Sequence, residues 1–423
     1  MKRLALPLLF VLASCAHQPP ASLDALATTY VKLNLALGEH DKDWVDAYYG
    51  PPEWRDQAKQ EAKSVAAIHT EAMRLREQLS AFPIPADRML ALRRNYLIEQ
   101  LGALITKAEM LQGTRYSFDE EARRLYGVTP PRLSDEFFKS ALRNLDRELA
   151  GDGPLAERLE EYRSRFYIPS DKVDAVMQAA LKECRARTLQ EIELPAGENF
   201  TLEYVKNQPW SGYNWYQGNY QSLIQINTDL PMAIQRALDL ACHEGYPGHH
   251  TYNVQLEKNL VRDRGWVENS IYPLNSPQSL IAEGTGNYGL RIAFPGDERM
   301  KFDRDVLFPI AGLDPAEAER YHRVLGLMTA LSYGSNEAAR RWIDGEITRE
   351  QAIDWFAEHT LSTRQASEQR MKFIERYRSY VINYNVGLDL VTAHIESHEG
   401  RAAQWQAFRE LISSPMLPSN LRK

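Results

Sequence analysis

Cysteine is scarce in this chain, with three residues among 423. A small scaffold held together by many disulfides is therefore excluded. Cys184 and Cys242 both lie in segments with helical patterning. An oxidising compartment would allow one disulfide between them, but we expect two buried free thiols, because free cysteine is among the most frequently buried residue types.

The chain also lacks long basic blocks, internal repeats and low-complexity segments beyond its N-terminus. The net charge is −7, which argues against nucleic acid as the main partner. Hydrophobic residues make up 44% and charged residues 25%, an ordinary globular composition. The length suits one large domain or two ordinary ones, with a sizeable buried core.

The N-terminus has the pattern of a targeting segment. A basic start, Met1 to Arg3, precedes a short apolar run over residues 4–12, too short to span a membrane stably. The sequence Leu-Ala-Ser-Cys then ends at Cys15 and resembles the lipobox of bacterial lipoproteins. We expect a signal peptide over 1–14, lipidation of Cys15 and a tether over 15–23, rather than an ordinary signal peptide. Because Ala16 is not aspartate, this resemblance implies an outer-membrane lipoprotein that faces the periplasm of a Gram-negative cell.

Most of the mature chain is patterned as helices, which predicts a mainly α fold. Residues 24–193 form an N-terminal helical region, with helices expected over 22–37 and 86–111 among others. A catalytic region follows over 194–423. It opens with three strand-like segments that we expect to form a small antiparallel sheet, over residues 200–205, 213–217 and 220–227. The stretch 364–396 is again predicted to be helical.

The apolar helical run 233–241 leads into a cluster of histidines, His243-Glu244-Gly245-Tyr246-Pro247-Gly248-His249-His250. Zinc hydrolases use two imidazoles as metal ligands and an adjacent glutamate as the proton acceptor, commonly as H-E-x-x-H. Here Pro247 occupies the second histidine position. On an unbroken helix His250 would lie about 10 Å along the axis from His243, too far for both to bind one zinc ion.

Pro247 and Gly248 make an unbroken helix improbable, because proline removes a hydrogen-bond donor and clashes with the preceding turn. We therefore predict a bulge or break between Gly245 and Gly248. His243 and His249 would then be zinc ligands, with Glu244 as general base. His250 would lie nearby as a transition-state donor, or as the ligand in place of His249 if the bulge is larger.

A third ligand is expected, because catalytic zinc usually has three protein ligands. Glu283 lies 34 residues beyond His249 in an apolar segment, where a carboxylate needs a partner. A salt bridge to a basic residue is the alternative. Near the C-terminus, Tyr384 is the first choice as the donor to the oxyanion. Tyr380 and Arg378 are the expected substrate-binding residues, with aromatic packing and a surface salt bridge as their plainer alternatives.

Three blocks together, H-E-G-Y-P-G-H-H, A-E-G-T-G-N-Y and Y-N-V-G-L-D-L, resemble the bacterial DUF885 family over roughly residues 25–410. The resemblance implies a mostly helical, gluzincin-like zinc metallopeptidase fold, often secreted or lipid-anchored, in one continuous domain over 24–410. It also implies metal and catalytic roles for His243, Glu244, His249 and Glu283. The chain departs from the family at Thr285 and Asn253, so its pocket is expected to differ.

These patterns predict a zinc-dependent peptidase of the cell envelope, with a peptide as substrate and Zn²⁺ as cofactor. The membrane would be contacted through the N-terminal lipid anchor, and no nucleic acid would be bound. A zinc hydrolase of a non-peptide amide or ester is the alternative, as is a non-catalytic binding lipoprotein of the same fold. The sequence gives no indication of oligomeric state.

Overall fold

The structure is a computed structural model that describes residues 22–422. The predicted signal peptide over 1–14, the lipidated Cys15 and nearly all of the tether lie outside the described residues.

Helices dominate the first half of the chain. They are α1 (Leu23–Gly38), α2 (Pro52–Glu61), α3 (Val65–Ala81), α4 (Arg88–Leu111), α5 (Phe118–Tyr126), α6 (Asp135–Glu148), α7 (Leu155–Ser164), the 3₁₀ turn η1 (Ser170–Lys172) and α8 (Val173–Leu189). The strands are β1 (Val45–Tyr48), β2 (Asn199–Val205), β3 (Gly212–Gly218), β4 (Gln221–Asn227) and β5 (Ile271–Pro273).

Helices also form the second half. They begin with α9 (Ile234–Leu240), the π turn η2 (Ala241–Gly245), α10 (His249–Leu256), η3 (Glu257–Arg262), η4 (Val267–Ser270), α11 (Pro277–Ala293), α12 (Glu298–Phe302), η5 (Asp303–Leu307) and α13 (Phe308–Ala311). The remainder are η6 (Pro315–Glu317), α14 (Ala318–Met328), η7 (Thr329–Tyr333), α15 (Gly334–Ile343), α16 (Arg349–Thr360), α17 (Arg364–Tyr377), η8 (Arg378–Tyr384), α18 (Val386–Glu396), α19 (Arg401–Ile412) and α20 (Pro418–Leu421).

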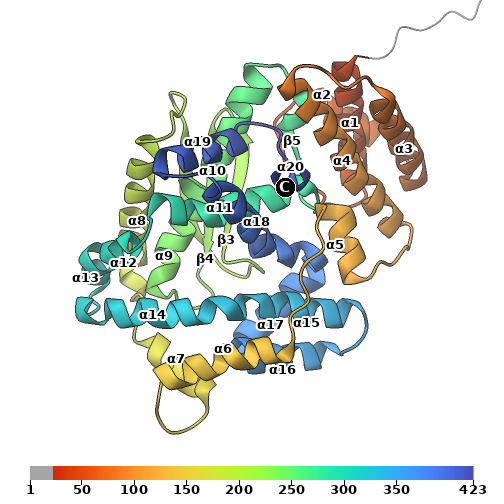
Figure 1. Cartoon of the computed structure of the whole chain (residues 1–423). Coiled ribbons are helices and arrows are strands. Elements are labelled where there is room, and N and C mark those ends of the chain that lie inside the picture. The colour runs from red at the N-terminus through yellow and green to blue at the C-terminus, as the bar shows by residue number, and fades with distance from the viewer. Residues whose placement is uncertain (1–21, 423) are drawn as a thin grey trace, which may run out of the picture.

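The helix boundaries follow local capping chemistry. The Ser22 hydroxyl accepts a hydrogen bond from the amide of Ala25 and begins α1, as the sequence predicts. Asp87 caps α4 in the same way, one residue after the predicted start at Ala86. In Figure 1 helices α1 to α4 group on one side of the molecule, α14 and α15 cross below, and α11 and α18 run through the centre.

The mainly helical fold with a small sheet before the segment that carries His243 is confirmed, but this sheet is mixed rather than wholly antiparallel. Strand β3 pairs antiparallel with β4, whereas β2 pairs parallel with β4 on its other side. Alternating side chains identify a strand but not its direction. Here the turn at Gly218 folds β3 back onto β4, and β4 occupies the centre of the sheet.

Helix α11 crosses α18 closely at two glycines. A Cβ atom on Gly284 would come within 2.5 Å of the Gly387 carbonyl oxygen, and one on Gly387 within 2.6 Å of the Leu280 carbonyl oxygen. Only glycine permits this approach. It explains why the A-E-G-T-G and Y-N-V-G blocks carry these residues, and it fixes the position of the segment that carries Glu283.

The predicted continuous helix over 364–396 is interrupted. Helix α17 ends at Tyr377, and the 3₁₀ segment η8 precedes α18. The break lies at Arg378, which has a positive φ of 53°. The buried carboxylate of Glu121 holds it by accepting hydrogen bonds from Arg378 Nε at 2.8 Å and from the Ser379 hydroxyl at 2.6 Å. Because Glu121 belongs to α5, this tertiary contact is invisible in the local sequence.

A large hydrophobic core extends from α1 to α17, and a second cluster packs the outer side of α10 and α11 against α18 and α19. The segment that carries His243 and His249 lies where these two clusters adjoin, since Cys242 and Tyr246 belong to the first and Tyr252 to the second. Across residues 22–422, none of the helices has both the length and the apolar character needed to cross a bilayer.

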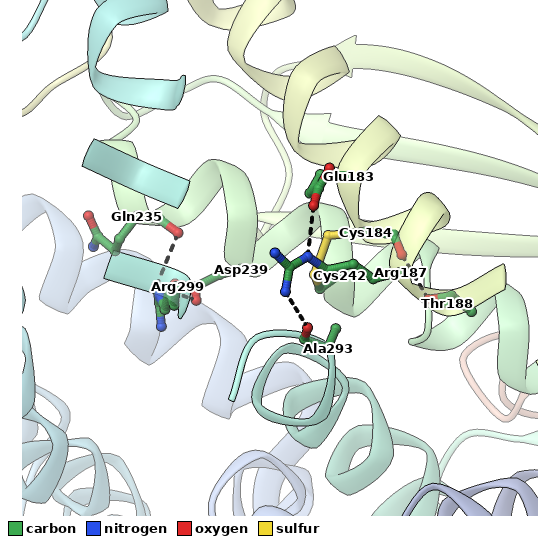
Figure 2. The surroundings of a disulfide bond; sticks show 9 residues. All are labelled: Glu183, Cys184, Arg187, Thr188, Gln235, Asp239, Cys242, Ala293 and Arg299. Atoms are coloured by element: carbon green, nitrogen blue, oxygen red, sulfur yellow. Dashed lines mark hydrogen bonds and ion pairs between the residues drawn. A yellow bond between two sulfur atoms is a disulfide. The ribbon is translucent and has the colours of Figure 1, made fainter. Parts of the chain in front are cut away.

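The expectation of two free thiols is wrong, because Cys184 of α8 and Cys242 of η2 form a disulfide. Helix α8 packs against α9 and η2 and brings the two Cα atoms to 5.6 Å. Figure 2 shows this bond beside Arg187, which is hydrogen-bonded to Glu183 and to the carbonyl of Ala293. The disulfide therefore ties α8 to the residue immediately before His243.

Candidate metal centre

The helix that carries His243 changes geometry where the sequence predicts. Helix α9 continues into the π turn η2, and the chain then leaves the helix at Tyr246, whose peptide bond to Pro247 is cis. A new helix, α10, begins at His249. The predicted break between Gly245 and Gly248 is therefore confirmed, with the bulge beginning slightly earlier, at Ala241.

Gly248 brings the two helices together. Its amide donates to the carbonyl of Cys242 at 2.9 Å, and a Cβ atom at this position would lie 1.9 Å from the carbonyl oxygen of His243. No other residue fits this contact. As a result, the imidazole rings of His243 and His249 lie with their centroids 4.5 Å apart and nearly perpendicular.

Glu283 reaches the two imidazoles from a second helix, α11, as predicted. Its Oε2 atom lies 3.3 Å from Nε2 of His243, and its Oε1 atom lies 3.7 Å from Nε2 of His249. Two ligands of a tetrahedral zinc ion, each 2.0–2.1 Å from the metal, are roughly 3.3 Å apart. The three side chains therefore have the spacing and chemistry of a zinc ligand set.

Glu244 adjoins the same cluster. One ligand atom each from His243, Glu244 and His249 all lie within 4.8 Å of one another, so this triad is a second geometric choice for a metal. We assign Glu283 as the ligand, because it makes the short contacts to both imidazoles. Oε2 of Glu244 and Oε2 of Glu283 are both buried without a hydrogen-bond partner. Buried carboxylate oxygens need a partner, and a cation would supply one.

The electrostatics of the cluster also suit a cation. Burial, followed by the nearby charge of His243, lowers the pKa of His249 to about 4, which keeps the ring in its neutral, metal-binding form. Burial opposes protonation of His243, yet its close contact with the Glu283 carboxylate and the charge of Glu244 raise its pKa. Burial is also the main reason why the pKa of Glu244 rises to about 7, a value suited to a general base.

Two tyrosines from η8 line the site in different ways. The Tyr380 hydroxyl donates to Oε1 of Glu283 at 2.8 Å, so Tyr380 orients a ligand instead of offering its hydroxyl to a substrate. The Tyr384 ring is inclined by 29° to that of His243, with centroids 6.5 Å apart, and its hydroxyl has no hydrogen bond within residues 22–422. Asn287, one turn after Glu283, holds Tyr384 by donating to its carbonyl at 2.9 Å.

The cluster opens into a cavity of about 770 Å³, within the range of small-molecule and peptide sites. His243, Glu244, His249, Glu283 and both tyrosines line it. The five predicted metal and catalytic residues other than His250 therefore meet in one place, although they come from four separate segments of the chain.

A scan against protein-family models found no match, and a search of the curated proteins found none either. Among solved structures, the chain is similar to the crystal structure of a "putative lipoprotein" from Colwellia psychrerythraea, with 15% identity and a TM-score of 0.50 over 96% of this chain and 76% of that one. A "putative lipoprotein of unknown function" from Shewanella oneidensis has 12% identity and a TM-score of 0.43, over 94% and 79%. The first likeness is one of fold.

His250 does not lie where the sequence prediction placed it. Its side chain is fully buried and does not line the cavity. Nδ1 lies 2.8 Å from the Ser222 hydroxyl and Nε2 lies 3.0 Å from Oε2 of Glu198. The expectation that it acts as a donor or ligand near the metal is therefore corrected: the new helix beginning at His249 turns the next side chain toward the sheet.

Arg378 is likewise not part of the site. It is bound to Glu121 and does not line the cavity, so the predicted substrate-binding role is corrected in favour of the salt-bridge alternative. Arg378 has a structural role instead, because it begins η8 and its bond to Glu121 anchors the segment that carries Tyr380 and Tyr384.

Several cavity residues were missed from the sequence. Asp46 of β1 accepts a hydrogen bond from the Tyr213 hydroxyl. Burial, together with the charges of Glu283 and Glu244, raises the pKa of Asp46 to about 8. Asn214 of β3 donates to the carbonyl of Glu244 at 2.7 Å and steadies the π turn. No local motif marks either residue, because each reaches the site through strand placement alone.

Proposed function

We propose that the chain is a zinc-dependent peptidase of the cell envelope and a lipid-anchored relative of the DUF885 metallopeptidases. One observation carries the proposal: two imidazoles and a buried carboxylate converge at zinc-ligand spacing in a cavity, beside a second carboxylate with an unpaired oxygen. The motif blocks that resemble DUF885 supply these same residues. His243, His249 and Glu283 would hold the zinc ion.

A zinc ion bound there would supply a Lewis acid that polarises the substrate carbonyl and lowers the pKa of water. Glu244 accepts the proton of the attacking water and passes it to the leaving amine, a role that its raised pKa favours. Tyr384 donates its free hydroxyl to the oxygen on which negative charge develops. Tyr380 keeps Glu283 oriented through its hydrogen bond.

The sheet supports a peptide as substrate. Among the described strands, β3 has β4 as its single neighbour, so its other edge is unpaired. Gly212 at the start of β3 lies against Glu244, since a Cβ atom there would be 2.8 Å from Oε1 of that residue. An extended peptide that pairs with this edge would therefore pass beside the general base.

The proposed location is the periplasmic face of the outer membrane, through lipidation of Cys15. The lipobox-like Leu-Ala-Ser-Cys supports it, and the Cys184–Cys242 disulfide is consistent with an oxidising compartment. The Colwellia and Shewanella proteins carry the printed description of lipoproteins.

The test combines metal analysis with peptide hydrolysis. Purified protein should hold one zinc ion per chain, and His249→Ala should lose it. Glu244→Gln should keep zinc but cleave a peptide library at least about a hundredfold more slowly. Glu136→Gln, at an exposed ion pair with Arg143, is the control and should behave as wild type. Absence of stoichiometric zinc would refute the proposal. Zinc without Glu244-dependent peptide cleavage would favour a non-peptide amide or ester substrate instead.

A further inference from the structure

Arg370 of α17 is a cation in the cavity that no protein group neutralises. Within residues 22–422 it makes neither a hydrogen bond nor an ion pair, and its guanidinium lies 5.8 Å from the ring centroid of Phe373. Protein atoms surround Arg370 on most sides, but its side chain borders the cavity and is accessible to a ligand there. Most other arginines of the described chain have carboxylate or carbonyl partners, so this one is unusual.

A second arginine faces the same space. Arg236 of α9 also lines the cavity, where its Nη2 donates to the Ser211 hydroxyl at 3.3 Å. Its nearest carboxylate, Asp239, lies 3.7 Å away and is bound more closely, at 2.8 Å, by Arg299. Burial lowers the pKa of Arg370, and the positive charge of Arg236 acts in the same direction. Two positive charges therefore line one cavity, and Arg370 has no carboxylate partner among the described residues.

These arginines lie next to the metal cluster. The positive charge of Arg370 acts on the Tyr384 hydroxyl. Phe373, on the same helix as Arg370, packs against Tyr384 with the two ring centroids 6.0 Å apart. Tyr384 in turn lies against His243. A single tyrosine thus separates Arg370 from a zinc ligand. An anion bound at Arg370 would therefore lie in the same cavity as the two imidazoles and Glu283.

From this arrangement we infer that Arg370, assisted by Arg236, binds a carboxylate of the substrate in the cavity where the bond is cleaved. The inference rests on the proposed peptidase function. Guanidinium groups bind planar carboxylates through paired hydrogen bonds. A singly charged carboxylate fits better than a phosphate, because the carboxylates of Glu244 and Glu283 line the same cavity and repel a doubly charged group. When the carboxylate is the free C-terminus, the chain removes C-terminal residues.

Matched peptides test the inference by hydrolysis. Each peptide is offered as the free acid and as the C-terminal amide, and with glutamate or glutamine next to the scissile bond. We expect wild type to have a KM lower by roughly ten- to hundredfold for the carboxylate member of one pair. Arg370→Gln should remove this preference, and Arg370→Lys should restore part of it. Arg364→Gln, on the same helix but paired outside the cavity with Glu350, should retain it.

Equilibrium binding to Glu244→Gln separates this inference from the proposed function. The same peptide pairs are titrated into Glu244→Gln and Glu244→Gln/Arg370→Gln proteins. A preference for the free acid that depends on Arg370 identifies the C-terminus as the source, and a preference for glutamate identifies a side chain. Either result supports the inference even if no peptide is cleaved. Equal binding of carboxylate and neutral members, or a preference unchanged by Arg370→Gln, overturns it.

Discussion

Removal of the Cys184–Cys242 disulfide tests how the metal-binding turn is held. The two cysteines are 58 residues apart in the sequence, and their bond closes a loop of that size in the unfolded chain. Loop-closure entropy for such a loop corresponds to about 4 kcal/mol at 25 °C. The double variant Cys184→Ala/Cys242→Ala should therefore unfold with a free energy lower by up to about 4 kcal/mol, a large part of the stability of an ordinary domain.

Zinc affinity should change much less, by under about tenfold. The π turn keeps two other contacts after the disulfide is lost, from the Gly248 amide to the Cys242 carbonyl and from Asn214 to the Glu244 carbonyl. Arg187 also still ties α8 to α11 through the carbonyl of Ala293. These bonds hold the native geometry, whereas the disulfide mainly restricts the unfolded chain.

The assay is denaturant unfolding followed by circular dichroism, with zinc affinity measured by competition with a chelator. Wild type treated with a reductant should match the double variant, and the reductant should not shift the double variant itself. Equal unfolding midpoints for oxidised wild type and the double variant would refute the loop-closure argument. A loss of zinc affinity much greater than tenfold would instead show that the disulfide shapes the native site.

Three further predictions concern the site itself. In zinc-free protein the pKa of Glu244 is raised to about 7, so the folded state binds a proton that the unfolded chain has lost, and the contribution of Glu244 to the free energy of unfolding should fall by roughly 3 kcal/mol between pH 4.5 and pH 7. The lowered pKa of His249 acts in the opposite direction over this range, so the Glu244 contribution is measured as the difference between wild type and Glu244→Gln in urea titrations. Gly286→Ala places a Cβ atom 3.0 Å from the first histidine ligand and should weaken zinc binding in a chelator competition, whereas Gly326→Ala, with open space around it, should not. Tyr380→Phe should lower zinc affinity about 10- to 100-fold by freeing the carboxylate ligand, while Tyr384→Phe should retain zinc and lower kcat by about 10²–10³; the reverse pattern would contradict the assigned roles.

Local chemistry made much of the fold predictable. Ser22 begins a helix because its hydroxyl satisfies a free backbone amide, and Gly38 ends it, as the sequence predicts. The strands before the metal-binding helix were also predicted from their alternating side chains. What failed was strand direction, since β2 could pair antiparallel with β3 or parallel with β4, and only tertiary packing selects the parallel pair.

The candidate site was likewise predicted where local sequence decides the geometry, and predicted wrongly where contacts with distant segments decide it. His243, His249 and Glu283 were predicted because Pro247 excludes a continuous helix and a third ligand is chemically required. His250 and Arg378 were misplaced because their partners, Glu198 and Glu121, come from distant segments and satisfy them away from the cavity. Buried polar groups bond to whatever the fold brings near, and neither partner can be found from spacing along the chain.

This motif has two more residues between its histidines than H-E-x-x-H, and this insertion changes which contacts set the spacing of the two imidazoles. In the common form one helix carries both histidines, so its own backbone hydrogen bonds set their spacing. Here the ligands stand on two different helical segments, η2 and α10. Their spacing depends on the close contact of Gly248 with the His243 carbonyl and on the hydrogen bond from Asn214 to the Glu244 carbonyl. Zinc affinity in this chain should therefore respond to tertiary packing around the turn, in a way that a single continuous helix does not require.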